Sequence, residues 1–270
     1  MIYGSKDTVD WIDRHTTALA KVAPLVDRQL SPLGLATIGI LNPCSDEVIL
    51  DIGCGAGQTL SQIARHVGPG GRVIGNDISA LLLSVAQERF GSNPAIEFIK
   101  ADAQALALPD GSIDGAFSRF GVMGFKDPAS AFSNFRRMLR PGGRIAFCCW
   151  RALEENEIDH FPISVAKRVD QVQRAPFSFA DPEYLRDLLE KAGFEDITIV
   201  KYDEPVSCGG LDDTVEVLLS VGALGQMVRA DPDLRSKVEP DLRVALSARS
   251  NPASISLIAA VWIVSASVAD

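Results

Sequence analysis

The stretch Val48-Ile49-Leu50-Asp51-Ile52-Gly53-Cys54-Gly55-Ala56-Gly57-Gln58 decides the organisation of the chain. Its first half is a short apolar run rich in branched residues, which is typical of a strand buried on both faces. Three glycines follow at alternate positions, and the next apolar residues recur at helical spacing, at Leu60, Ile63, Ala64 and Val67. The pattern predicts a strand, a glycine turn and a helix, which bring backbone N–H groups and a helix N-terminus to a ligand.

The spacing of these glycines bears on the kind of ligand. A dinucleotide fingerprint reads G-x-G-x-x-G, whereas the residue three after Gly55 is Gln58, so the loop reads G-x-G-x-G. This spacing speaks against an NAD-dependent oxidoreductase, and no pair of residues suited to hydride transfer is evident. A tight turn that binds nothing is the structural alternative.

Composition limits the class of protein. The 270 residues contain 47% hydrophobic and 23% charged residues and carry a net charge of −9, which is typical of a globular protein and unlike a nucleic-acid binder. None of the five cysteines forms a C-x-x-C pair, so we expect no metal site and reduced thiols in a cytoplasmic protein. The N-terminus lacks a signal-peptide pattern, and the apolar stretch 255–269 is too short to span a membrane.

Strand and helix patterns alternate after the glycine loop. We expect strands at 72–76, 95–100, 112–118 and 144–150, separated by helices, then a further helix after Asp181-Pro182 and strands at 197–202 and 258–265. Alternation of this kind predicts an α/β fold with a doubly wound, Rossmann-like parallel sheet, whose ligands bind at the carboxyl ends of the strands. Residues 151–180 are expected to be irregular.

Two acidic residues follow predicted strands at this ligand-binding edge. Asp77 comes about 20 residues after the glycine loop and is placed to accept hydrogen bonds from a ribose hydroxyl pair. Its alternative role is to cap the next helix, but Ser79 can do that instead. Asp102 could accept from an adenine amine while the Ala103 N–H donates to the ring, and Ile78 could cover the face of the base.

Four blocks of the chain resemble the class I S-adenosylmethionine (SAM) dependent methyltransferases, in order and in spacing. They are Ile49–Gly57, Gly75–Ser79, Ala101–Gln104 through Phe117-Ser118, and Leu139–Arg144. Within that superfamily the chain is similar to the branch of the ubiquinone/menaquinone C-methyltransferases, most clearly at Ser118–Met123 and from Pro141 to Trp150. The resemblance covers residues 45 to 150 specifically and the rest only loosely.

The resemblance implies a seven-stranded sheet with an antiparallel last strand. It also implies that SAM is the cofactor and S-adenosylhomocysteine the product. The implied cofactor-binding residues are Asp51, Gly53, Gly55, Gln58, Asp77, Ile78, Asp102, Ala103 and Ser118. The chain departs from the family pattern at Gly124 and after Asn156, near the expected acceptor pocket. The class of acceptor therefore does not follow from the resemblance to the family.

Catalytic candidates are few, because methyl transfer from a sulfonium needs alignment of the acceptor more than a fixed set of catalytic groups. His160 lies after the fifth predicted strand and could act as a base, and a surface histidine is the alternative. Arg119, at the end of the fourth strand, could orient an anionic acceptor or the carboxylate of the cofactor, or could pair with a nearby glutamate. His15 is a weaker candidate for the base.

The remaining segments predict a cover over the acceptor. We expect one domain over 1–270. Its parts are an N-terminal helical lid at 1–44, a SAM-binding core at 45–205, a helical insert at 206–252 and the final strand at 253–270. Pro24 and Pro32 punctuate the lid. A helix that only packs on the sheet is the alternative to the lid. A sealed site favours a small, partly apolar acceptor, with no nucleic acid, and a homodimer is one candidate assembly. SAM-assisted chemistry without methylation, such as a cyclisation, is the alternative function.

Overall fold

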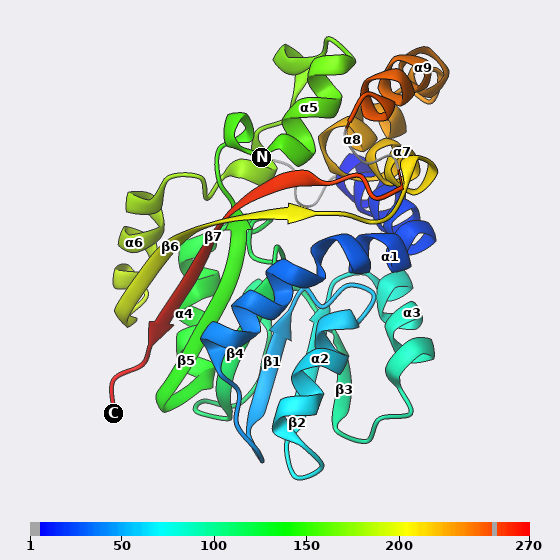
Figure 1. Cartoon of the computed structure of the whole chain (residues 1–270). Coiled ribbons are helices and arrows are strands. Elements are labelled where there is room, and N and C mark those ends of the chain that lie inside the picture. Colours follow the sequence, from blue (N-terminus) through cyan, green and yellow to red (C-terminus); the bar gives the residue numbers. More distant parts are fainter. Residues whose placement is uncertain (1–5, 250–252) are drawn as a thin grey trace.

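The computed structural model describes residues 6–249 and 253–270 (Figure 1). The strands are β1 (Val48–Ile52), β2 (Arg72–Asp77), β3 (Ile96–Lys100), β4 (Ile113–Arg119), β5 (Leu139–Trp150), β6 (Glu195–Val206) and β7 (Leu257–Ser267). The helices are α1 (Lys6–Leu41), α2 (Gln58–Val67), α3 (Ala80–Phe90), α4 (Pro128–Met138), α5 (Glu157–Val165), α6 (Pro182–Lys191), α7 (Leu211–Ser220), α8 (Gly222–Ala230) and α9 (Asp233–Ser247). Across these two ranges, no helix is both long and apolar enough to cross a membrane.

The strands of the described residues form one seven-stranded sheet in the order β3-β2-β1-β4-β5-β7-β6. The strands from β3 to β5 in this order pair in parallel, whereas β7 is antiparallel to both of its neighbours. The predicted doubly wound sheet with an antiparallel last strand is confirmed. In the parallel register Ile52 pairs with Asn76 and Asp77 with Lys100, so the strand ends chosen from the sequence meet at one edge.

Helices cover both faces of the sheet and bury its apolar side chains. On one face, α2, α3 and the end of α1 pack against β1 to β4, through residues such as Ile38, Leu60 and Phe117. On the other face, α4 packs on the sheet through a cluster of phenylalanines that includes Phe132, Phe135 and Phe147. The helix α6 joins the same core through Leu185 and Leu189. Burial of these side chains from both sides explains the continuous apolar runs of the central strands.

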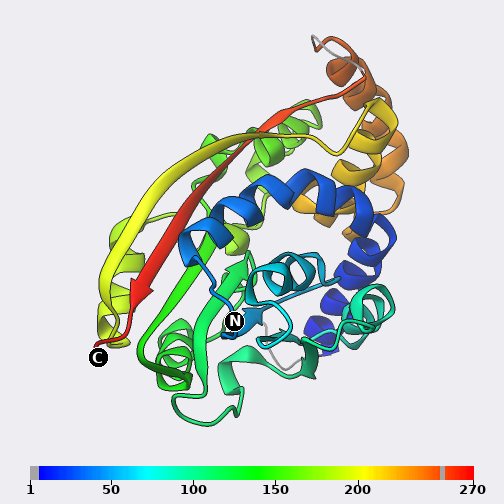
Figure 2. The same ribbon diagram turned by 60° about the horizontal axis from the view of Figure 1, so that its bottom comes forward.

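The N-terminal segment is one continuous helix of 36 residues, with Pro24 and Pro32 inside it. The sequence analysis expected these prolines to punctuate the helical segment, because a proline removes one backbone hydrogen bond and crowds the preceding turn. A proline can instead bend a helix, and α1 curves between the sheet and the helices at the carboxyl edge (Figure 2). Val22, Val26 and Leu33 form part of its buried face, and the side chains of Trp11 and Ile12 lie outside the described residues.

A second group of helices lies beyond the carboxyl ends of the strands. It consists of α5, α7, α8 and α9, and the long strands β6 and β7 reach toward it (Figures 1 and 2). Its core includes Leu153, Ile163, Val215, Leu242 and Leu246. The expectation that residues 151–180 are irregular is wrong, because α5 lies there. Its helical pattern is short and contains Pro162, which concealed it in the sequence.

Candidate cofactor site

The glycine loop between β1 and α2 leaves open space at its centre. Gly53 and Gly55 have φ angles of 69° and 54°, in the left-handed region that favours glycine. A Cβ at Gly53 would lie 2.7 Å from the Cα of Gly121, so the end of β1 and the residues after β4 pack without room for a side chain. A Cβ at Gly55 would meet nothing within 4 Å. The loop therefore presents bare backbone to open space at the N-terminus of α2.

Asp77 holds this loop in place. One carboxylate oxygen, Oδ2, accepts a hydrogen bond of 2.9 Å from the Gly55 N–H, and Oδ1 accepts one of 2.8 Å from the Ser79 N–H. Burial raises the pKa of Asp77, although these backbone hydrogen bonds act in the opposite direction. Ser79 caps α3 by accepting from the Leu82 N–H, as the sequence predicted. Asp77 is thus half-buried at the edge of the loop, and Ser79 rather than Asp77 caps α3.

Asp51 contributes a buried oxygen that has no protein partner. Its side chain is 1% exposed, and the Thr59 hydroxyl donates a hydrogen bond of 2.5 Å to Oδ2. No described group donates to Oδ1. Burial raises the pKa of this carboxyl to about 7, against the lowering effects of Thr59 and Arg119. Buried polar atoms usually have partners, so this oxygen fits a donor supplied by a ligand, such as the ammonium group of SAM.

The residues expected at the adenine lie at the ends of β2 and β3. Ile78 is 45% exposed, which is high for a large apolar side chain and suits a flat base. Asp102 is exposed and accepts a hydrogen bond of 3.0 Å from the Gln104 N–H, and Ala103 begins the short turn of helix that follows. Sequence reasoning missed Asn76, whose side-chain amide donates to the carbonyl of Ala101 at 2.9 Å and ties β2 to this segment.

Ser118 uses its hydroxyl within the protein. Its Oγ donates to the carbonyl of Ile52 at 2.8 Å and accepts from the Gly121 N–H at 3.0 Å. The side chain is fully buried. Ser118 therefore joins the end of β4 to the end of β1 and fixes the floor of the glycine loop, and a direct contact with the cofactor stays a prediction.

A cluster of polar side chains joins α1 to the glycine loop, and we call Asp27, Gln58, Arg89 and Arg119 the α1 clamp. Arg89 forms an ion pair of 2.6 Å with Asp27 and donates to the carbonyl of Ala56 at 2.9 Å. Arg119 donates to Gln58 Oε1 at 2.6 Å and lies 3.6 Å from Asp27 Oδ1. The Gln58 amide donates to the backbone carbonyl of Asp27 at 3.0 Å. The acidic partner of Arg119 is thus an aspartate of α1, and the suggested pairing with a glutamate is wrong.

Asp27 and Arg89 were not found from the sequence. Asp27 lies 62 residues from Arg89 in the chain, and neither belongs to a motif. The available signal was weak: an acidic residue on the apolar face of α1, between Val26 and Leu30, is out of place unless it has a partner.

His160 lies in α5 and is half-buried. Its Nδ1 is 3.4 Å from the hydroxyl of Ser164, and that hydroxyl also donates to the His160 carbonyl at 2.7 Å. These contacts are within its own helix and do not connect it to the glycine loop. The neighbouring Asp159 is buried and accepts a hydrogen bond of 2.7 Å from the Ala223 N–H, which joins α5 to the start of α8.

Comparison with known proteins identifies the core of this site. Residues 50–147 match the family described as a methyltransferase domain. These residues form a class I methyltransferase domain. The predicted similarity to the ubiquinone/menaquinone C-methyltransferase branch is confirmed by a relative from Hahella chejuensis, the ubiquinone/menaquinone biosynthesis C-methyltransferase UbiE. The two sequences are 39% identical over 100 residues, which cover 36% of this chain and 40% of that protein.

Two further similarities concern a longer part of the chain. An O-methyltransferase, cnsE, of Penicillium expansum is 32% identical over 191 residues, which cover 69% of this chain and 66% of that one. The solved structure of phosphoethanolamine N-methyltransferase 2 of Haemonchus contortus, bound to phosphomonomethylethanolamine and S-adenosylhomocysteine, superposes with a TM-score of 0.57 at 21% identity. It covers 88% of this chain and 53% of the other, and supports the methyltransferase fold.

These matches are partial in length. The methyltransferase domain spans the glycine loop, the strand ends and β4, but α1 and the helices α7 to α9 lie outside it. The chain covers 29% and 40% of the length of two curated relatives that it matches.

Proposed function

We propose that this protein transfers a methyl group from SAM to a small, partly apolar acceptor and releases S-adenosylhomocysteine. The observation that carries the proposal is the open glycine loop at Gly55 between two carboxylates, Asp51 with an unpartnered buried oxygen and Asp77 at the end of the next strand. The methyltransferase domain matched over residues 50–147 contains all three residues.

The chain's own residues would hold the cofactor along this edge. Asp51 would receive its ammonium group, the backbone from Gly53 to Gln58 would face its amino-acid part, and Asp77 would accept from the ribose. Ile78, Asp102 and Ala103 would surround the adenine, and Ser118 would support the loop from below. When bound, SAM supplies a methyl group on a sulfonium, so the protein has to align the acceptor and exclude water.

The acceptor would lie beyond the carboxyl edge, under α1 and the helices α5 and α7 to α9. The apolar core of these helices and the clamp between α1 and the loop support a covered site for a small molecule. In this proposal α1 is the lid, Arg119 positions Gln58 and α1, and His160 remains the predicted base. A cytoplasmic location and a homodimer stay predictions.

Calorimetry with SAM, S-adenosylhomocysteine and NAD in parallel tests the cofactor. We expect saturable binding of the first two and none of NAD, and binding of NAD alone would overturn the proposal.

Transfer of radiolabelled methyl from SAM to a panel of quinols, phenols, indoles and amines then tests the acceptor class. Higher turnover on RNA or on a folded protein would contradict a small acceptor. Cofactor binding without methyl transfer to any acceptor would point to the alternative chemistry.

A further inference from the structure

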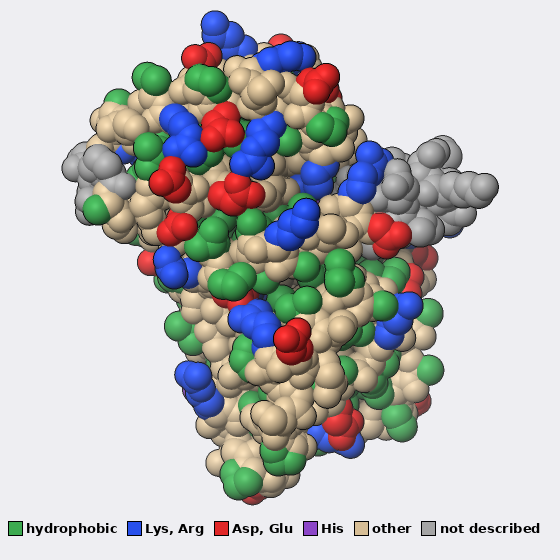
Figure 3. All heavy atoms as spheres, turned by 90° about the vertical axis from the view of Figure 1, so that its right-hand side faces the viewer, with side chains coloured by type: hydrophobic (Ala, Val, Ile, Leu, Met, Phe, Trp, Pro, Cys, Tyr) green, Lys and Arg blue, Asp and Glu red, His purple; other side chains and the backbone are tan. Residues whose placement is uncertain are grey.

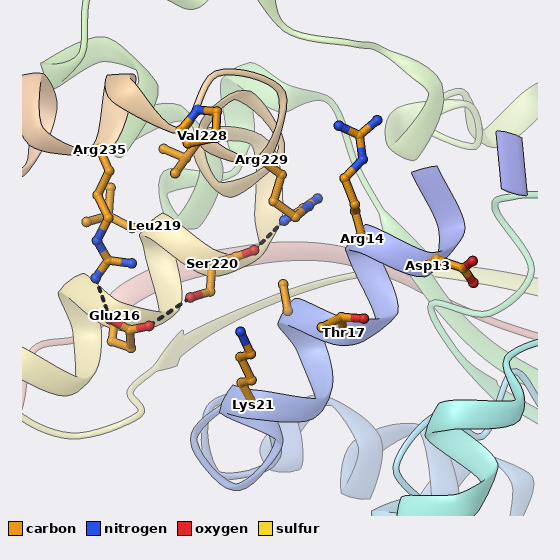
Figure 4. Close-up of a pocket in the computed structure, with 12 residues that line it drawn as sticks. Asp13, Arg14, Thr17, Lys21, Glu216, Leu219, Ser220, Val228, Arg229 and Arg235 are labelled. Atoms are coloured by element: carbon orange, nitrogen blue, oxygen red, sulfur yellow. Dashed lines mark hydrogen bonds and ion pairs between the residues drawn. The ribbon is translucent and has the colours of Figure 1, made fainter. Parts of the chain in front are cut away.

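A cavity lies between α1 and the helices α7, α8 and α9, and no residue of the glycine loop lines it (Figure 4). Its volume is about 450 Å³, within the roughly 300–1,000 Å³ of small-molecule sites. Lys21, the last residue of α1 that lines the cavity, lies six residues before Asp27, which corresponds to about 9 Å along a helix. The cavity shares no residue with the α1 clamp, although the same helix lines both.

Among the described residues that line this cavity, basic side chains outnumber acidic ones. Arg14, Lys21, Arg229 and Arg235 line it, against Asp13 and Glu216. Glu216 is engaged, because it accepts from Arg235 at 2.5 Å and from the Ser220 hydroxyl at 3.1 Å. Asp13 points away from the arginines in the close-up view (Figure 4). The cavity therefore carries a local positive excess in a protein whose net charge is −9.

The charge on one face of the molecule can be compared with this excess. The face of the molecule drawn in Figure 3 shows basic and acidic side chains interspersed over its upper part, with no broad surface of one sign. A ligand attracted by the cavity would thus be a small molecule that enters it, since an extended polyanion would need a continuous basic face.

Arg229 is the central residue, because it pairs with none of the described acidic side chains. Its guanidinium donates to the carbonyl of Ser220, and its Nη2 lies 3.2 Å from Nδ1 of His15. No carboxylate among the described residues forms an ion pair with it. Burial and the nearby Arg14 lower the pKa of Arg229 to about 10. An arginine that is partly buried beside another cation is costly unless an anion compensates it.

His15 cannot supply that anion. Burial, followed by the charge of Arg229, lowers the pKa of His15 to about 4, so the imidazole is neutral near pH 7. A neutral imidazole can accept a hydrogen bond from Arg229 but does not balance its charge. The apolar side chains of Leu219 and Val228, which also line the cavity, carry no charge that could balance Arg229.

We propose that this cavity binds a small organic anion through a carboxylate or a phosphate group held by Arg229, with Arg14 and Lys21 beside it. Guanidinium groups suit both anions, because their planar N–H donors match two oxygens at once. The site goes beyond the proposed methyl transfer, and its occupation requires no SAM.

The three histidines of the chain allow a site-specific test. The imidazole resonances of the full chain are followed by NMR at pH 7 while inorganic phosphate or succinate is added at constant ionic strength. We expect a saturable shift for His15, which lies beside Arg229, and little change for His66 and His160. Saturation with phosphate alone or with succinate alone identifies the preferred group, and no saturable shift with either probe overturns the proposal.

Variants separate this site from general electrostatic effects. Arg229→Gln should weaken the binding of the active probe at least tenfold, and Arg229→Lys should weaken it less, because one cation remains. Arg243→Gln is the matched control, since Arg243 pairs with Asp212 and Glu239 outside the cavity. Unchanged affinity in a folded Arg229→Gln or Arg229→Lys protein, or an equal loss in Arg243→Gln, would contradict the assignment. Circular dichroism confirms that each variant is folded.

Discussion

At the scale of single residues, Asp51 makes the stability of the protein depend on pH. Its pKa in the folded state is about 7, above the ordinary value of 3.8, so the folded protein keeps a proton that the unfolded chain releases. The contribution of Asp51 to stability should therefore be complete at or below about pH 4 and should be lost as the pH rises toward 7, by roughly 4 kcal/mol at most.

Replacement by a neutral residue of the same shape tests this dependence. Asp51→Asn should make the free energy of unfolding, measured with urea at pH 4.5, 6 and 8, decline less steeply than in the unaltered protein. Burial also raises the pKa of Asp77 and Asp159, so part of the decline should remain. Asp187→Asn, at an exposed pair with Lys191, is the control and should leave the slope unchanged. An equally steep decline in Asp51→Asn would contradict the assigned pKa.

At the scale of elements, the α1 clamp makes the lid part of the cofactor site. Asp27→Asn removes the charge that Arg89 and Arg119 share. We expect SAM to bind about tenfold more weakly or worse, because a hydrogen bond to a charged group contributes about 1.5–3 kcal/mol. Calorimetry measures the affinity. Asp13→Asn makes the same change of charge on the same helix outside the clamp, and equal losses in both variants would show that the effect is not local.

The contact between α5 and α8 rests on one buried carboxylate. Asp159→Ala leaves the Ala223 N–H without its acceptor and should lower the free energy of unfolding by about 2 kcal/mol. Asp159→Asn retains an acceptor oxygen at the same place and should lose less than half of that. Urea unfolding measures both. Equal losses would mean that the carboxylate charge, rather than the hydrogen bond, joins these helices.

At the scale of the whole molecule, the proposed cofactor bridges the sheet and α1, so its binding should stabilise the complete fold. At a SAM concentration 100 times its dissociation constant, the gain is about 2.7 kcal/mol. The unfolding midpoint should then rise by several degrees in a thermal scan, since about 2–4 °C per kcal/mol is typical of this chain length. NAD at the same concentration should leave it unchanged. A rise with NAD and none with SAM would overturn the cofactor assignment.

Much of the fold could be predicted because its signals are local. The glycine spacing after Ile52, the Asp127-Pro128 and Asp181-Pro182 helix starts, and the alternation of strands and helices each depend on a few neighbouring residues. Turn chemistry and side-chain periodicity act over that distance. α5 was missed because its pattern is short and contains a proline. The two prolines expected to punctuate the N-terminal helical segment lie inside one continuous helix, α1.

The sequence by itself determined the strand–loop–helix unit and the acids at the strand ends, since these follow from local pattern. The methyltransferase character of residues 45 to 150 came from their resemblance to a known family. Only the tertiary structure decided that Asp27 meets Arg89 and Arg119. It also decided that, among the described residues, nothing donates to one buried oxygen of Asp51 and no carboxylate pairs with Arg229 at its cavity. The physical reason is that burial and charge pairing depend on which distant segments pack together, and α1 brings those segments into contact by crossing the carboxyl edge of the sheet.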